Sequence, residues 1–209
     1  MATFVLVHGS LHGGWCWKKV TPLLRAAGHQ VYAPTLSGLA DRAHLLTRDI
    51  GLDTHIKDIE GLLNYEDLTG VVLVGHSSGG MVISGVAALV PGRLAHLVYL
   101  DAAVPRPGQS LLDEVDSELK AQIIERVRTK GDGWKLPVIV TPGAPMAGVS
   151  NDADLRWMTP RLTPHPFRTW QDPMPPGSAD VAGIPRTYIS CTVEQGRLLA
   201  ETAAKIRGI

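Results

Sequence analysis

The sequence has no net charge, because its 20 lysine and arginine residues balance 20 aspartate and glutamate residues. A chain without a basic excess does not attract nucleic acid or an anionic membrane surface. The sequence also contains no apolar run long enough to span a membrane, and its first residues carry neither a basic region nor a cleavage site. We therefore expect a cytoplasmic protein whose partner is a small molecule and not nucleic acid or a membrane.

Cysteine is also scarce, with Cys16 and Cys191 as the two examples. They could form one disulfide at most, and in a reducing compartment two free thiols are expected. No cluster of histidine, cysteine and aspartate has the spacing of a metal site, so we expect neither a metal nor another cofactor. The 209 residues, 44% of them apolar, are enough for one domain with a sizeable core.

The most informative stretch covers residues 71–90, VVLVGHSSGGMVISGVAALV. Its apolar run at 71–74 is too short for a helix and is typical of a strand buried on both faces. Residues 75–79 match the pattern Gly-x-Ser-x-Gly, in which a strand turns so sharply into a helix that the central side chain stands clear of the backbone. A helix over 81–90 should follow. The pattern predicts that Ser77 is a nucleophile, and the alternative is a glycine-rich loop without a catalytic role.

The rest of the chain alternates short apolar runs with segments of helical periodicity. In the first expected helix Val20, Leu23 and Leu24 should face the core, and Asp53 or Thr54 should cap the second. Parallel strands joined by helices predict an α/β fold with a doubly wound, mostly parallel sheet and an active site at the carboxyl ends of the strands. We expect strands at 4–7, 30–33, 71–74, 97–100 and 187–191, and helices at 15–27, from 53 or 54 onward, at 81–90, at 110–128 and at 196–206.

Composition changes after residue 103, since 12 of the 15 prolines and three of the five tryptophans lie between Pro105 and Pro185. One helix, at 110–128, is expected there. We interpret 1–103 as the first part of the core, 104–183 as a lid inserted over the site and 184–209 as the second part of the core. The alternative for the insertion is a long irregular surface loop.

Three stretches identify a resemblance: FVLVHGSLHGGWCWKKVTPLLRAAGHQVYAPTLSG, VVLVGHSSGGMV and LVYLDAAVPRPGQSLLDEV. The chain resembles the α/β-hydrolase superfamily, and within it the small esterases grouped with plant hydroxynitrile lyases and salicylate-ester hydrolases. The resemblance implies the α/β-hydrolase fold and hydrolysis of carboxylic esters through an acyl-enzyme on Ser77. It also implies that a histidine takes the serine proton and that a carboxylate orients that histidine.

The oxyanion hole is expected from two backbone N–H groups. Ser78 follows the nucleophile at a helix N-terminus, which favours negative charge. Matching HGSLHGG to the loop of the resembled family implies the N–H of Ser10 as the second donor. The same match places His12 at the floor of the pocket, with a structural role as the alternative. We expect Leu11, His12 and His76 to line the substrate pocket.

Two carboxylates are candidates for the acid. The resembled plant proteins carry aspartate in a run similar to CTEDKG, where this chain has Glu194 in CTVEQG. Other α/β hydrolases place the acid after the preceding strand, where Asp101 stands. We prefer Asp101, because the longer side chain of Glu194 would have to retract to reach the same histidine.

The expected histidine has no counterpart, since the family places it in a loop after one further strand and the sequence ends at Ile209. We interpret the chain as a truncated product without its last strand and helix. It should then be nearly inactive, with the strand at 187–191 as an unpaired edge that favours self-association and a possible homo-oligomer. His165 is the substitute base considered among the eight histidines.

Two other functions remain open. A hydroxynitrile lyase would use the same serine, but the resembled lyases carry threonine where Gly9 stands and Glu-Ser-Cys where residues 76–78 stand. The second alternative is a small-molecule binding protein that retains the pocket but has no complete triad. The tryptophans of the insertion favour hydrophobic or aromatic esters as substrates.

Overall fold

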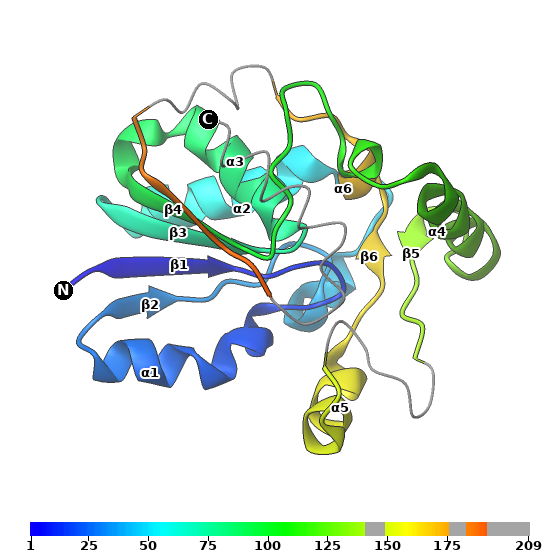
Figure 1. Cartoon of the computed structure of the whole chain (residues 1–209), viewed down its shortest axis with the longest axis horizontal. Coiled ribbons are helices and arrows are strands. Elements are labelled where there is room, and N and C mark those ends of the chain that lie inside the picture. Colours follow the sequence, from blue (N-terminus) through cyan, green and yellow to red (C-terminus); the bar gives the residue numbers. More distant parts are fainter. Residues whose placement is uncertain (141–148, 176–182, 192–209) are drawn as a thin grey trace.

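The computed structural model describes residues 1–140, 149–175 and 183–191. Glu194 and the helix expected at 196–206 lie outside these residues. The core is a sheet with the strand order β2-β1-β3-β4-β7, in which every described pair is parallel (Figure 1). This confirms the α/β class. The strands are β1 Thr3–Val7, β2 Gln30–Tyr32, β3 Val71–His76, β4 Leu94–Leu100 and β7 Arg186–Ile189.

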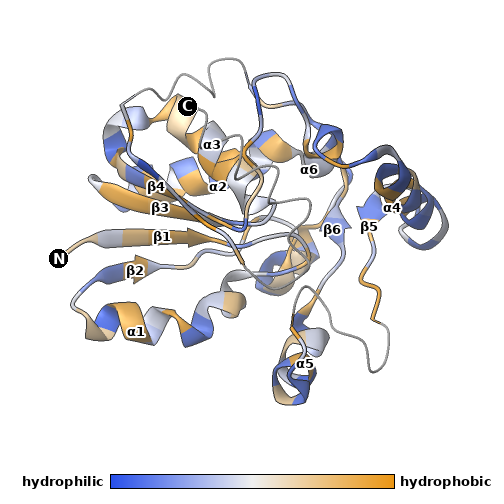
Figure 2. Ribbon diagram, in the orientation of Figure 1, coloured by the Kyte–Doolittle hydropathy of each residue, from blue (hydrophilic) through white to orange (hydrophobic). Residues whose placement is uncertain are grey.

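Helices cover both faces of this sheet, as the apolar runs of β1 and β3 require (Figure 2). On one face Val5 and Val7 join the large core cluster with side chains of α2 (Leu52–Tyr65) and α3 (Gly79–Leu89). On the other face Leu6 and Val74 pack with Trp17, and α1 (Thr21–Ala26) contributes Leu24 at the margin. Successive residues of one strand thus enter different cores, which makes the sheet doubly wound.

The prediction of one helix over 15–27 is wrong. A 3₁₀ turn over Gly14–Lys19 precedes the short α1. Pro22 explains the break, because proline has no N–H to donate within a continuous helix and restricts the residue before it. The predicted inward face is also wrong in part, since Val20 is 38% exposed and Leu23 is 71% exposed.

The predicted cap of α2 at Asp53 or Thr54 is wrong as well. The helix begins at Leu52 with Gly51 as its N-cap residue. The Leu52 N–H donates to Asp172 Oδ2 at 2.9 Å, and the Gly51 N–H donates to Thr54 Oγ1 at 3.4 Å. A carboxylate 120 positions away therefore satisfies the first turn.

The insertion between β4 and β7 contains more structure than the single helix predicted at 110–128. Asp116 caps α4 by accepting from the Leu119 N–H at 2.9 Å, so the helix begins seven residues later than predicted and Leu112 lies outside it. Ile123 and Val127 of α4 form a small separate core with Leu112 and Phe167. The elements are α4 Ser117–Lys130, α5 Asp152–Met158, α6 Arg168–Gln171 and the antiparallel pair β5 Lys135–Leu136 and β6 His165–Pro166.

Short 3₁₀ turns connect several of these elements. Those not yet given span Ala40–Leu45, Pro91–Arg93, Leu111–Asp113 and Thr159–Arg161. None of the helices in the described ranges is both long and apolar enough to cross a membrane. Cys16 and Cys191 are both free thiols, and burial raises the pKa of Cys16 to about 12.

Candidate active site

Ser77 occupies the sharp turn between β3 and α3. Its φ of +52° lies in the left-handed region, which non-glycine residues rarely adopt. A Cβ on Gly75 would lie 2.7 Å from the Gly79 carbonyl oxygen, and a Cβ on Gly79 would lie 2.9 Å from the His8 carbonyl oxygen. Side chains at these two positions would not fit. The expected strand, turn and helix geometry is therefore present around Ser77.

The turn is fixed by the residues that follow β4. The Ser77 N–H donates to the Leu100 carbonyl at 3.3 Å, and the Ser77 carbonyl accepts from the Ala103 N–H at 3.0 Å. A Cβ on Gly80 would lie 2.0 Å from the Ala103 carbonyl oxygen, so α3 starts in direct backbone contact with this segment. The strain at Ser77 is thus maintained by hydrogen bonds on both sides of the residue.

The loop after β1 lies against this turn, since a Cβ on Gly9 would be 2.9 Å from the Ser77 Cβ. The next residue in that loop is Ser10, whose amide N–H has no hydrogen-bond partner among the described residues. The same holds for the N–H of Ser78, the N-cap residue of α3. Two unpaired donors, one of them at a helix N-terminus, are what an oxyanion needs.

The side chains of these two serines are also joined. Ser10 Oγ donates to Ser78 Oγ at 2.8 Å, and Trp170 Nε1 of α6 donates to Ser10 Oγ at 2.9 Å. Neither hydroxyl was expected to have a role, and Trp170 is one of the three tryptophans of the insertion that were expected to favour hydrophobic or aromatic esters. The partners are 68 and 160 positions apart, so no local pattern could have identified these contacts.

Asp101 follows β4 directly with a φ of +45°. Its N–H donates to the Ile189 carbonyl at 2.8 Å, and its Oδ1 accepts from the Cys191 N–H at 3.3 Å. Burial, assisted by the nearby Asp101 charge, raises the pKa of Tyr188 to about 12. Asp101 therefore lies where β4 and β7 end, and the competing candidate Glu194 lies outside the described residues.

Ser77 Oγ forms no hydrogen bond to a histidine within the described part of the chain. His8 is buried, with Nδ1 donating to the Gly9 carbonyl at 2.9 Å and Nε2 accepting from the Leu36 N–H at 3.1 Å. Burial lowers the pKa of His8 to about 3. His8 is thus a neutral structural residue at the start of the loop after β1.

His165 is buried and has both ring nitrogens occupied. The Thr169 hydroxyl donates to the Pro166 carbonyl at 2.8 Å, so it accepts from His165 Nε2, also at 2.8 Å. Nδ1 is then the acceptor for the Leu11 N–H at 3.4 Å. Burial holds the pKa of His165 well below its usual value. The structure gives no support to His165 as a substitute base.

An aromatic cavity of about 320 Å³ lies beside the turn and contains two of the three predicted pocket residues. His12 stacks on Trp15 with ring centres 5.2 Å apart, and its Nδ1 donates to the Ser10 carbonyl at 2.7 Å. Burial lowers the pKa of His12, and it lowers that of His76 to about 4. Leu11 does not line this cavity. The lining also includes Trp17, Leu100, Trp157 and Met158.

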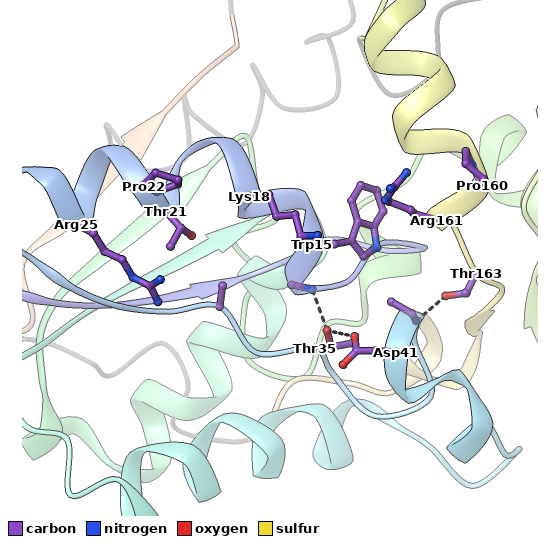
Figure 3. Close-up of a pocket in the computed structure, with 13 residues that line it drawn as sticks. Trp15, Lys18, Thr21, Pro22, Arg25, Thr35, Asp41, Pro160, Arg161 and Thr163 are labelled. Atoms are coloured by element: carbon purple, nitrogen blue, oxygen red, sulfur yellow. Dashed lines mark hydrogen bonds between the residues drawn. The ribbon is translucent and has the colours of Figure 1, made fainter.

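A second cavity of about 790 Å³ is also lined by Trp15 (Figure 3). The Thr35 hydroxyl in its wall accepts from the Gly14 N–H at 3.0 Å and donates to Asp41 Oδ1 at 2.6 Å. None of the predicted site residues lines this cavity. We therefore place the candidate active site at the smaller cavity, which includes His76 of the Ser77 turn.

Comparisons with known proteins identify the family of the chain. Residues 4–208 match the model of a family described as "Alpha/beta hydrolase family". The chain is 40% identical over 197 residues to the carbendazim hydrolyzing esterase of Nocardioides sp. (strain SG-4G), which covers 90% of this chain and 79% of that protein. It is 38% identical over 122 residues to methylesterase 1 of Arabidopsis thaliana, covering 56% of this chain and 46% of that one.

The fold is also similar to that of a solved structure. An extracellular alpha/beta-hydrolase from a Paenibacillus species superposes with a TM-score of 0.82 at 25% identity, covering 92% of this chain and 78% of that one. That protein is described as sharing structural and functional homology with tobacco salicylic acid binding protein 2.

Proposed function

The chain belongs to the alpha/beta hydrolase family, and on that premise we propose that it hydrolyses carboxylic esters through Ser77. The observation that carries the proposal is the placement of Ser77, at a φ of +52° and in contact with the Gly9 loop. The N–H groups of Ser10 and Ser78, which have no partner among the described residues, lie on the two segments that meet there. The relatives named as esterases support the same reaction class.

The reaction begins when Ser77 Oγ attacks the ester carbonyl carbon. The carbonyl π electrons move to the oxygen, and the N–H groups of Ser10 and Ser78 bind the resulting oxyanion, each contributing about 3–4 kcal/mol. Collapse expels the alcohol and leaves an acyl group on Ser77. Water then attacks the acyl carbon and releases the acid. In the first step the serine proton passes through a general base to the leaving alcohol, and in the second a proton of the water returns through the same base to Ser77 Oγ. Asp101 is our candidate for orienting that base.

The cavity beside the turn favours hydrophobic or aromatic esters. Its walls include Trp15, Trp17 and Trp157, which offer large apolar faces. His12 and His76 are neutral at pH 7, because burial lowers the pKa of each. The two charged side chains of the lining, Lys19 and Asp154, pair with each other, so the cavity favours uncharged esters. A cytoplasmic location and self-association also stay predictions.

The lyase alternative is less compatible with the loop after β1. The resembled lyases carry threonine at the position of Gly9, where a Cβ would lie 2.9 Å from the Ser77 Cβ. A side chain there would require the loop or the turn to move. We therefore prefer the esterase.

Turnover of p-nitrophenyl butyrate by the full natural gene product, with and without Ser77→Ala, tests the proposal. The variant should lose roughly 10⁶-fold in kcat. A fluorophosphonate should label the wild-type protein at Ser77 and should not label the variant. Cyanide release from mandelonitrile without ester hydrolysis would indicate the lyase. Ligand binding with neither reaction would indicate a binding protein, and a variant that retains a tenth of the activity would exclude Ser77 as the nucleophile.

A further inference from the structure

We propose that Trp170 is a positioning residue that fixes the separation of the two oxyanion donors by acting through the hydroxyls of Ser10 and Ser78. The proposal rests on the ester hydrolysis proposed above. It assigns a function to the insertion beyond covering the pocket, because α6 would then set the geometry in which the developing charge is bound.

The direction of the two hydrogen bonds defines how the three side chains are connected. Trp170 Nε1 can only donate, so Ser10 Oγ accepts from it at 2.9 Å. Ser10 Oγ then donates its single hydrogen to Ser78 Oγ at 2.8 Å. Successive hydrogen bonds of this kind polarise and strengthen one another. The indole N–H thus orients both hydroxyls of the residues that supply the oxyanion donors.

The insertion also holds the next residue of the same loop. The Leu11 N–H donates to His165 Nδ1 at 3.4 Å, and the Leu11 carbonyl accepts from the Thr163 N–H at 3.0 Å. Leu11 has a φ of +66°, a conformation that costs energy for a leucine and needs such support. Residues 10 and 11 are therefore held in place by three hydrogen bonds from the segment that includes β6 and α6.

Trp170 is itself well anchored. Its ring packs against the main core and against the small core of Ile123 and Phe167. Helix α6 lies beside α2 (Figure 1), and Asp172, directly after α6, accepts from the Leu52 N–H at 2.9 Å. The indole N–H is thus fixed relative to the central fold, as a group that positions a loop has to be.

The consequence for the reaction is specific to the transition state. The ester carbonyl oxygen gains its full charge after Ser77 attacks, so a displaced donor weakens transition-state binding more than substrate binding. A displacement of about 1 Å can cost on the order of 100-fold in rate. Loss of the Trp170 hydrogen bond should therefore lower kcat and leave KM nearly unchanged.

The test is a double-mutant cycle on the full natural gene product with Trp170→Phe, Ser10→Ala and the double variant. Each single change should lower kcat for p-nitrophenyl butyrate roughly 10- to 100-fold with KM within about twofold. The double variant should be no slower than the slower single variant, because both changes remove the same connection. Trp134→Phe is the matched control. Its ring contacts Arg48 and Lys135 and does not line the cavity beside the turn, so it should leave kcat unchanged.

A second measurement does not depend on turnover. In the amide NMR spectrum, Trp170→Phe should shift the Ser10 and Ser78 N–H resonances, and Ser10→Ala should speed solvent exchange of the Trp170 indole proton. The inference would be overturned if the kcat losses of the two single variants multiplied in the double variant, or if the effect were confined to KM. Unchanged amide resonances of Ser10 and Ser78 would also overturn it. A wild-type protein that hydrolyses no ester would refute the proposed function, and the NMR result would then decide the positioning role by itself.

Discussion

The amide N–H of Cys191 donates a hydrogen bond to Asp101 Oδ1 at 3.3 Å. This contact joins the loop after β4 to the start of the loop after β7, which are the two places where the catalytic acid was expected. Because β4 and β7 are parallel neighbours, both loops leave the same edge of the sheet. Mutation of the two acids distinguishes them.

Asp101→Asn should lower kcat/KM for p-nitrophenyl butyrate on the order of 10⁴-fold, because an amide cannot hold the histidine in its active tautomer. Glu194→Gln should retain most of the activity. Steady-state kinetics on the two variants decide the assignment. A large loss for Glu194→Gln with little change for Asp101→Asn would move the acid to Glu194.

Gly9→Ala should reduce activity without unfolding the protein. The added Cβ would lie 2.9 Å from the Ser77 Cβ and 3.2 Å from the His76 carbonyl oxygen, so the loop after β1 must move away from the turn. We expect a loss of roughly 10- to 100-fold in kcat. Gly61→Ala is the comparison, because its Cβ would meet no atom within 4 Å. Equal activity of the two variants would contradict the close contact between loop and turn.

Gly80→Ala should destabilise the fold itself. Its Cβ would lie 2.0 Å from the Ala103 carbonyl oxygen, whereas a Cβ on Gly92 would meet nothing within 4 Å. We expect Gly80→Ala to lower the free energy of unfolding by about 1–3 kcal/mol, the usual cost of overpacking. Urea unfolding of the two variants measures this difference. A Gly80→Ala protein as stable as the Gly92→Ala protein would show that α3 can shift away at little cost.

The stability of the fold should decrease as the pH falls below about 6.5, the ordinary pKa of histidine. His8, His55 and His165 are buried, and burial lowers the pKa of each, to about 3 for His8. The unfolded chain therefore binds protons that the folded chain does not. Each such histidine removes up to about 1.4 kcal/mol of unfolding free energy per pH unit between its unfolded and folded pKa values.

Urea unfolding between pH 7.5 and pH 4.5 checks this slope. His8→Gln should flatten it by about one proton, since glutamine does not titrate. A slope that stays the same in His8→Gln would mean that His8 is protonated in the folded protein.

The sequence predicted those parts of the molecule that local physics determines. The apolar run at 4–7 has no polar alternation, and a strand buried between two cores requires this. The glycines around Ser77 occupy places where a Cβ would overlap backbone atoms. The start of α2 was predicted incorrectly, because Asp172 provides the hydrogen bond that its first turn needs. The contact between Trp170 and Ser10 was missed for the same reason, since it depends on how the insertion packs.

The parallel pairing of β4 with β7 makes the whole insertion a single connection in the sheet. During evolution or in the laboratory, such a connection can be exchanged while the register of every strand is preserved, and a new insertion brings a new pocket wall. The exchange also removes the Thr163 N–H, the His165 ring and the Trp170 indole. These three groups form hydrogen bonds with Ser10 and Leu11. Chimeras chosen for pocket shape alone should therefore acquire new substrates but lose turnover. Grafts that keep these three groups should acquire new substrates and retain turnover.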